Sequence, residues 1–337
     1  MRTSERTYTG MRRGHVAALL AITSAVLVGA CGISDEPPPS GDPKVIAAAA
    51  ATESAVARPV PEPEAPITMV SHEPAVAVPS NTTGNVTYGD AEKVFRAGRY
   101  EEATELFEAY TTRKPENLWG HYMLGISAWK AGDHNRAESA LRRTLELDPS
   151  HAKALVNLGR VLLEQNRPAA ALDFTEEAVA VTPESVDAWR VLANVRAGLG
   201  AVEQAVEAYR RALVLDDKDA WSMNNLGLLM IREGRYEEAL PPLARAVELR
   251  PGTAVFQNNL GVALERAGHL VDAADAFRAA IGADPEHARA KTSLARVEER
   301  ATSGEWPMAD LAGLAGSFAD QIRFWREATV PADSTKS

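Results

Sequence analysis

Residues 220–253 read AWSMNNLGLLMIREGRYEEALPPLARAVELRPGT, and the fold of the chain can be inferred from this stretch. Its apolar positions recur at the i, i+3, i+4, i+7 spacing of two short amphipathic helices. They are Leu226, Leu229, Met230, Ala239, Leu243, Ala246 and Val247. Gly234 predicts a turn between the two helices, and Pro251 predicts the end of the second. One such pair cannot bury its apolar face alone, so the stretch predicts further copies that stack on it.

Copies of the same length do run without a break from position 84 onward. Small residues of the second helix are Ala103, Ala137, Ala171, Ala205, Ala239 and Ala273. Turn residues between the helices are Gly98, Gly132, Asn166, Gly200, Gly234 and Gly268. Small residues of the first helix are Ala91, Gly125, Gly159, Ala193, Gly227, Gly261 and Ala295, where two helix backbones can approach closely. Closing prolines are Pro115, Pro149, Pro183, Pro251 and Pro285, with Asp217 in the remaining slot.

These rows resemble the tetratricopeptide repeat. The resemblance covers six repeats without insertion, namely 84–117, 118–151, 152–185, 186–219, 220–253 and 254–287, and residues 288–301 look like the first helix of a seventh. It implies an all-α, right-handed superhelical solenoid of six to seven helix pairs over residues 84–301. An aromatic content of only 6% agrees with a helical protein rather than a β-sandwich.

The N-terminus predicts an export signal. Residues 1–15 carry four arginines against one glutamate, and residues 16–30 form an uncharged apolar run that is short for a membrane span. The run ends Leu-Val-Gly-Ala before Cys31, the chain's single cysteine, and this resembles the lipobox of bacterial lipoproteins. The resemblance implies a signal peptide over 1–30, with either Met1 or Met11 as its start, and lipidation of Cys31. Ordinary signal cleavage and an uncleaved anchor are the alternatives.

Residues 31–83 predict a disordered linker between the anchor and the repeats. They hold 10 of the 20 prolines and no Phe, Trp or Tyr, so little apolar surface can be buried to offset chain entropy. We expect either a plain spacer or a docking segment for another envelope protein. Because Gly32 rather than Asp follows the cysteine, the lipoprotein resemblance implies the periplasmic face of the outer membrane.

The charge and the motifs exclude several classes of function. A formal net charge of −10 argues against nucleic-acid binding, since the phosphate backbone favours a basic surface. The chain lacks the HExxH, GxSxG and GxxxxGK[ST] motifs and any cysteine–histidine cluster. We therefore expect no enzyme, no catalytic residue, no metal, no cofactor and no small-molecule substrate.

The tetratricopeptide resemblance also implies a concave groove, lined by first helices, that holds peptides of partner proteins. The groove residues it assigns are Trp119, Tyr122, Asn157, Arg160, Arg190, Asn194, Asn225 and Asn259, with Trp129, Trp221, Asn224 and Asn258 nearby. Arg190, Asn194 and Asn225 resemble half of a clamp for a C-terminal carboxylate. The other half fails, because Val255 and Asn259 stand where basic residues are expected. Trp119, Tyr122 and Trp129 form either an aromatic anchor for a partner or packing between repeats.

Residues 302–337 predict a C-terminal amphipathic helix and tail. One face of that helix would carry Leu311, Leu314, Phe318, Ile322 and Trp325. It could cap the open end of the solenoid, fold into the groove as an autoinhibitor, or dock on a partner. The whole pattern resembles lipidated repeat proteins that assemble pili or secretion systems. The expected function is a membrane-anchored scaffold of that kind, and the alternative is an adaptor that tethers peptidoglycan hydrolases or other envelope enzymes.

Overall fold

The computed structural model describes residues 86–302, 304 and 306–329, and within them it contains α-helices and no strand. The helices are α2 (Tyr88–Arg96), α3 (Tyr100–Arg113), α4 (Leu118–Lys130), α5 (His134–Leu147), α6 (Ala152–Glu164), α7 (Pro168–Val181), α8 (Val186–Gly198), α9 (Val202–Leu215), α10 (Ala220–Arg232), α11 (Tyr236–Leu249), α12 (Ala254–Ala267), α13 (Leu270–Ala283), α14 (Ala288–Ala301) and α15 (Leu311–Thr329). The expected all-α solenoid of helix pairs is confirmed. The predicted signal peptide 1–30, the lipidated Cys31 and the linker 31–83 lie outside the described residues.

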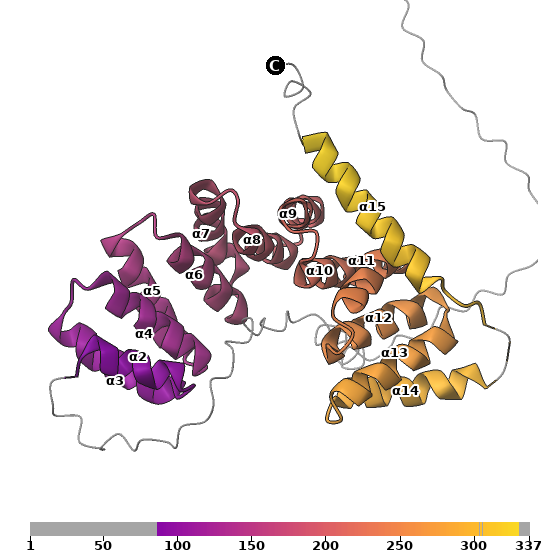
Figure 1. Cartoon of the computed structure of the whole chain (residues 1–337), viewed down its shortest axis with the longest axis horizontal. Helices are drawn as coiled ribbons and strands as arrows, with labels where there is room; N and C mark the ends of the chain where they lie inside the picture. The colour runs from indigo at the N-terminus through magenta and orange to yellow at the C-terminus, as the bar shows by residue number, and fades with distance from the viewer. Residues whose placement is uncertain (1–85, 303, 305, 330–337) are drawn as a thin grey trace, which may run out of the picture. The chain divides into compact units, whose positions relative to one another are not determined.

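Each repeat is one pair of helices joined by a tight turn (Figure 1). Helices α2 and α3 form the first pair, α12 and α13 form the sixth, and α14 takes the place of a seventh first helix. The turn residues Gly98, Gly132, Asn166, Gly200, Gly234 and Gly268 all have positive φ angles, between 58° and 94°. Glycine adopts this region at little cost, so the periodic row of turn residues is a row of left-handed backbone positions.

Small residues in the first helices allow close approach to the second helices of the same repeats. A Cβ atom added to Gly227 would lie 2.4 Å from Cγ of Leu243, and one added to Gly159 would lie 2.4 Å from Cγ2 of Thr175. Such separations are far inside van der Waals contact, so any larger residue would push the two helices of a pair apart.

The buried core is not uniform along the chain. The largest hydrophobic cluster extends from α8 through α14 and includes Phe318 and Ile322 of α15. Three smaller clusters hold α2 to α8 together. The C-terminal repeats therefore share one continuous core, to which the last helix contributes.

Helix α15 lies along α11 and also contacts α9, which are the second helices of repeats five and four (Figure 1). Its buried residues Phe318 and Ile322 belong to the predicted apolar face. At its C-terminal end, Nε of Arg326 donates to the carbonyl oxygen of Val214 at 3.1 Å, and the Arg326 guanidinium pairs with Asp217 at 3.3 Å. This placement differs from the expected cap and from the autoinhibitory position in the groove, because α15 covers second helices rather than the solenoid end or the first helices.

Candidate functional site

The predicted groove residues lie on consecutive first helices, α4, α6, α8, α10 and α12, which we call, together with α14, the first-helix face. Side-chain hydrogen bonds link neighbouring helices along this face. On its N-terminal side, Nδ2 of Asn157 donates to the hydroxyl of Tyr122 at 3.2 Å, and Nη1 of Arg160 donates to Oδ1 of Asn157 at 3.1 Å. Repeats two and three are thus joined through polar side chains as well as through their core.

A row of ion pairs continues from repeat three to the residue that precedes α10, and we call Arg160, Asp187, Arg190 and Asp219 the ionic chain. The Asp187 carboxylate accepts from both Arg160 and Arg190, and Nη1 of Arg190 donates to Oδ2 of Asp219 at 2.8 Å. Ser222 also donates to Asp219. Asp219 precedes α10 at its N-cap position, yet its side chain does not cap the helix, because Arg190 and Ser222 engage the carboxylate.

The ionic chain changes the interpretation of Arg190 as half of a carboxylate clamp. Its side chain is buried and pairs with two carboxylates of its own chain, Asp187 and Asp219. A ligand carboxylate would have to displace them, and removing one member of a buried pair is costly. Arg190 therefore joins repeats in the ligand-free chain.

A second row, the amide ladder, consists of Asn194, Asn225, Asn224, Asn259 and Asn258 on α8, α10 and α12. Nδ2 of Asn225 donates to Oδ1 of Asn194 at 3.2 Å, and Nδ2 of Asn224 donates to Oδ1 of Asn225 at 3.2 Å. Nδ2 of Asn259 donates to Oδ1 of Asn224 at 2.8 Å, and Nδ2 of Asn258 donates to Oδ1 of Asn259 at 3.4 Å. An amide carries both donors and an acceptor, so one residue type can continue such a row through three repeats.

One end of the amide ladder is hydrogen-bonded to Tyr209, and at the other end two buried polar atoms lack a hydrogen-bond partner within the described part of the chain. Tyr209 of α9 is buried and donates its hydroxyl to Asn194, and burial raises the pKa of this phenol far above its usual value. At the other end, Oδ1 of Asn258 and Nε1 of Trp221 are buried and have no hydrogen-bond partner among the described residues. Trp221 packs edge-on against Phe256, with ring centroids 4.9 Å apart. The ladder thus ends in one unpaired acceptor and, on the neighbouring helix, one unpaired donor.

The aromatic residues of the first-helix face play two different roles. Nε1 of Trp129 donates to Glu164 at 2.9 Å, so Trp129 packs between repeats two and three. Trp119 is 55% exposed and contacts the rings of Tyr122 and His151, with centroids 6.0 and 5.4 Å away. Partial burial lowers the pKa of His151, whose Nδ1 accepts the Ala154 amide hydrogen at the start of α6. Trp119 is therefore exposed, whereas Trp129 is half-buried and its indole N–H is already paired within the chain.

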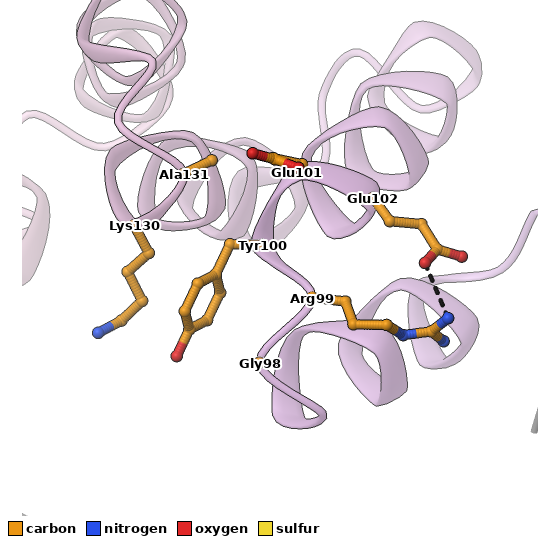
Figure 2. A pocket seen from close by; sticks show the side chains of 7 residues that line it. All are labelled: Gly98, Arg99, Tyr100, Glu101, Glu102, Lys130 and Ala131. Carbon is orange, nitrogen blue, oxygen red and sulfur yellow. Dashed lines mark ion pairs between the residues drawn. The ribbon is translucent and has the colours of Figure 1, made fainter. Parts of the chain in front are cut away.

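A pocket of about 450 Å³ lies apart from the amide ladder, at the turn between α2 and α3 and the end of α4. Figure 2 shows Lys130 beside the Tyr100 ring, which its ammonium faces at 5.5 Å from the centroid. Arg99 points to Glu102 instead, and the two form an ion pair at 2.9 Å. The lining is charged and open, and none of the predicted groove residues belongs to it.

Two further kinds of site are not found in the part of the chain that the structure describes. There, His, Cys, Asp and Glu side chains form no group of three that could hold a metal ion. None of the described helices combines the length and the apolar composition needed to cross a bilayer.

Sequence reasoning missed three members of these rows, Asp187, Asp219 and Tyr209. Asp187 stands three residues before Arg190, a spacing at which opposite charges on one helix often pair. The Asp187–Arg190 ion pair could therefore have been predicted from the sequence. Asp219 reads as an N-cap from sequence, and Tyr209 reads as an ordinary core residue of a second helix. Their pairing with α8 depends on how the repeats stack, and the sequence carries no local signal for it.

Comparison with known proteins agrees with this architecture. Residues 116–312, more than half of the chain, match the family described as the cilia and flagella-associated protein 70 C-terminal domain, a tetratricopeptide-repeat family. The uncharacterized protein y4yS of Sinorhizobium fredii is 30% identical over 106 residues, which are 32% of this chain and 58% of y4yS. The mouse protein O-mannosyl-transferase TMTC1 is 28% identical over 136 residues, which are 39% of this chain and 14% of TMTC1. The chain therefore spans less than two thirds of either relative.

Among solved structures, PilW, a widely conserved type IV pilus biogenesis factor, is similar with a TM-score of 0.55 at 18% identity. The similarity covers 60% of this chain and 94% of PilW, and it shows the fold. Together with the helix pairs, the left-handed turn residues and the matched family, it leads to one conclusion. The chain belongs to the tetratricopeptide-repeat family of the cilia and flagella-associated protein 70 C-terminal domain.

Proposed function

We propose that the chain binds extended peptide segments of partner proteins on its first-helix face. The tetratricopeptide fold is a protein–protein interaction scaffold, and proteins of this fold bind peptides of their partners. The observation that carries the proposal is the pair of unpaired buried atoms at the end of the amide ladder, the donor Nε1 of Trp221 and the acceptor Oδ1 of Asn258. Unpaired buried polar atoms are costly, so a ligand that pairs both atoms gains affinity by satisfying them.

A peptide backbone has the matching chemistry. Every non-proline residue offers one N–H donor and one C=O acceptor, so a backbone carbonyl can accept from Trp221 while a backbone amide donates to Asn258. Both atoms are shielded in the ligand-free chain. The peptide would reach them after a rotation of the two side chains. Exposed Trp119, some repeats away, supplies an apolar anchor of the kind that dominates binding energy at protein interfaces.

The sequence pattern supports a proposal for the cellular role. We place the protein in the bacterial cell envelope, held by acyl chains on Cys31 at the periplasmic face of the outer membrane, with residues 31–83 as spacer. In this position it would be an assembly factor for a pilus or secretion system, and PilW shares its fold. The second candidate is an adaptor that tethers peptidoglycan hydrolases. Tetratricopeptide scaffolds are typically non-catalytic, and we propose no enzymatic activity, no cofactor, no nucleic-acid partner and no small-molecule substrate.

The test is an affinity capture from detergent-solubilised envelope with the full chain as bait. The ladder variant carries Asn225→Ala and Asn258→Ala. The matched control carries Asn135→Ala and Gln204→Ala, two exposed polar residues on second helices. Melting curves of both variants confirm that each is folded before capture.

If wild type and control capture the same partners and the ladder variant loses them, the first-helix face is the binding site. Equal capture by all three baits contradicts the proposal. A catch of pilus or secretion components supports the assembly role, and a catch dominated by cell-wall hydrolases supports the adaptor role.

Lipidation has its own test. Cys31→Ala should move the protein out of the membrane fraction, and the mature wild-type N-terminus should gain the mass of a diacylglycerol and an acyl chain. A wild-type protein that is soluble and unmodified would contradict the anchor.

A further inference from the structure

A row of arginines runs beside the amide ladder. Arg232, Arg266 and Arg300 recur at the repeat period, in the last turns of α10, α12 and α14. Arg232 follows Asn225 by seven residues, and Arg266 follows Asn259 by seven. Seven residues are close to two helical turns, so each arginine lies on the same side of its helix as its asparagine, about 10 Å farther along. The arginine row and the ladder are therefore two parallel rows on one face.

Two of these guanidinium groups have no carboxylate of their own. Arg232 and Arg266 are exposed and form no ion pair among the described residues. Arg300 shares the buried carboxylate of Glu265 with Arg296, so two cations meet one anion. The C-terminal part of the first-helix face is thus cationic in a chain of net charge −10.

Basic residues in the last turn of a helix have an ordinary reason, which is to offset the helix dipole. Arg96 and Lys130 do so at the ends of α2 and α4. That reason concerns each helix alone and predicts nothing about the spacing of charges on a ligand. Both explanations give basic residues at the repeat period, and only a role in binding makes affinity depend on the spacing of charges along the ligand.

We infer that the ligand of this face is an acidic segment in an extended, polyproline-type conformation, with a carboxylate at every third residue. This inference rests on the proposed function and adds the chemistry of the partner. We take the step from one arginine to the next as about 10 Å, the order of the spacing between packed helices. A polyproline II chain advances about 9 Å in three residues and returns its side chain to the same side. In a β-strand, successive side chains point to opposite faces. Carboxylates three residues apart would therefore point alternately toward and away from the arginines.

The test measures binding of labelled peptides to the full chain in detergent, by fluorescence anisotropy at physiological ionic strength. One peptide repeats Glu-Pro-Pro, the second has the same composition with its glutamates adjacent, and the third repeats Gln-Pro-Pro. We expect the first to bind roughly fivefold tighter than the second, because only the first aligns one carboxylate with each repeat. The third should bind more weakly than both.

Two charge-matched variants then locate the site. Arg232→Gln with Arg266→Gln should weaken binding of the Glu-Pro-Pro peptide about tenfold, since each exposed ion pair contributes a few-fold. Arg211→Gln with Arg250→Gln removes the same charge from exposed positions outside the first-helix face and should leave binding unchanged.

Equal affinity for the two acidic peptides, or equal loss in the two variants, overturns the inference. Equal affinity for the acidic and the Gln-Pro-Pro peptides also overturns it but leaves peptide binding as such intact. If the ladder variant loses its captured partners while no acidic peptide binds, the proposed function stands and only the inferred chemistry of the ligand is wrong.

Discussion

Repeats two and three differ from repeats four to six in what their first helices present. On α4 the surface is aromatic, and exposed Trp119 lies beside Tyr122 and beside His151, the residue that precedes α6. On α8, α10 and α12 the same face is polar and largely buried, with Asn224 only 1% exposed. The second helices of repeats four and five are also covered by α15. A single repeat pattern thus carries two different chemistries.

This difference predicts that the two regions contribute differently to stability and to binding. Buried polar rows are stable only when their members are paired, and they then fix the positions of the helices that carry them. The C-terminal repeats have such rows and one continuous hydrophobic core. An exposed aromatic residue contributes little to folding and is well suited to bind a partner. We therefore expect substitutions on α8 to α12 to alter stability, and substitutions at Trp119 to alter binding.

The largest effect is expected at Arg190. Arg190→Ala would leave the buried Asp219 carboxylate with Ser222 as its remaining partner. Breaking a buried ion pair typically costs about 3–5 kcal/mol, and we expect a loss of that order in the free energy of unfolding. Chemical denaturation followed by circular dichroism measures it.

The control for Arg190 is Arg211→Ala, which removes an exposed arginine paired with Glu207. Its expected cost is below about 1 kcal/mol. Similar losses in the two variants would mean that the ionic chain does not stabilise the C-terminal repeats.

The next largest loss of stability is expected at α15, the helix that packs on the second helices α11 and α9. Phe318 of α15 is 3% exposed, and Phe318→Ala should cost about 3 kcal/mol and loosen α15 from α11. Hydrogen exchange of the α15 amides should accelerate, while α4 and α6 stay protected. Phe324→Ala, at an exposed position on the same helix, should change stability by less than about 0.5 kcal/mol. Unchanged exchange in the Phe318 variant would contradict the packing of α15.

A third experiment compares the two halves of the face directly. Asn259→Ala would leave buried Oδ1 of Asn224 without its donor, at a cost of about 1–3 kcal/mol. Asn157→Ala should cost less, because the half-buried hydroxyl of Tyr122 can bond to water. Melting temperatures of the two variants test this order, and a larger loss for Asn157→Ala would reverse the comparison.

The smallest effect is a pH dependence at the aromatic cluster. Burial lowers the pKa of His151 below its ordinary value of 6.5, so the folded state disfavours the charged imidazole. The unfolded chain binds that proton more readily, and stability should fall as the pH drops from neutral through 6.5 toward the folded pKa. His151→Asn keeps a side-chain oxygen for the α6 N-terminus but removes this titration. The melting temperature of wild type should therefore decrease more on acidification than that of His151→Asn, and equal decreases would exclude His151 as the cause.

The helix pairs and the turns between them could be predicted from the amino-acid sequence. Each of these depends on interactions within a few residues. Gly234 turns the chain because glycine adopts a positive φ cheaply, and Leu226 and Leu229 share a face because of the helical period. The resemblance to the tetratricopeptide repeat also assigned Asn157 and Asn225 to positions where the structure joins neighbouring repeats.

The packing of the repeats decided which polar groups of the described residues have a hydrogen-bond or ion-pair partner and which have none. Arg190 could serve a ligand until the stacking of repeats brings Asp219 to it, and Asp219 could cap α10 until Arg190 takes its carboxylate. The location of α15 on α11 and α9 was likewise open, because its apolar face fits any complementary apolar surface. In each case several partners have suitable chemistry, and the choice among them rests on distances and burial that arise only when the repeats pack.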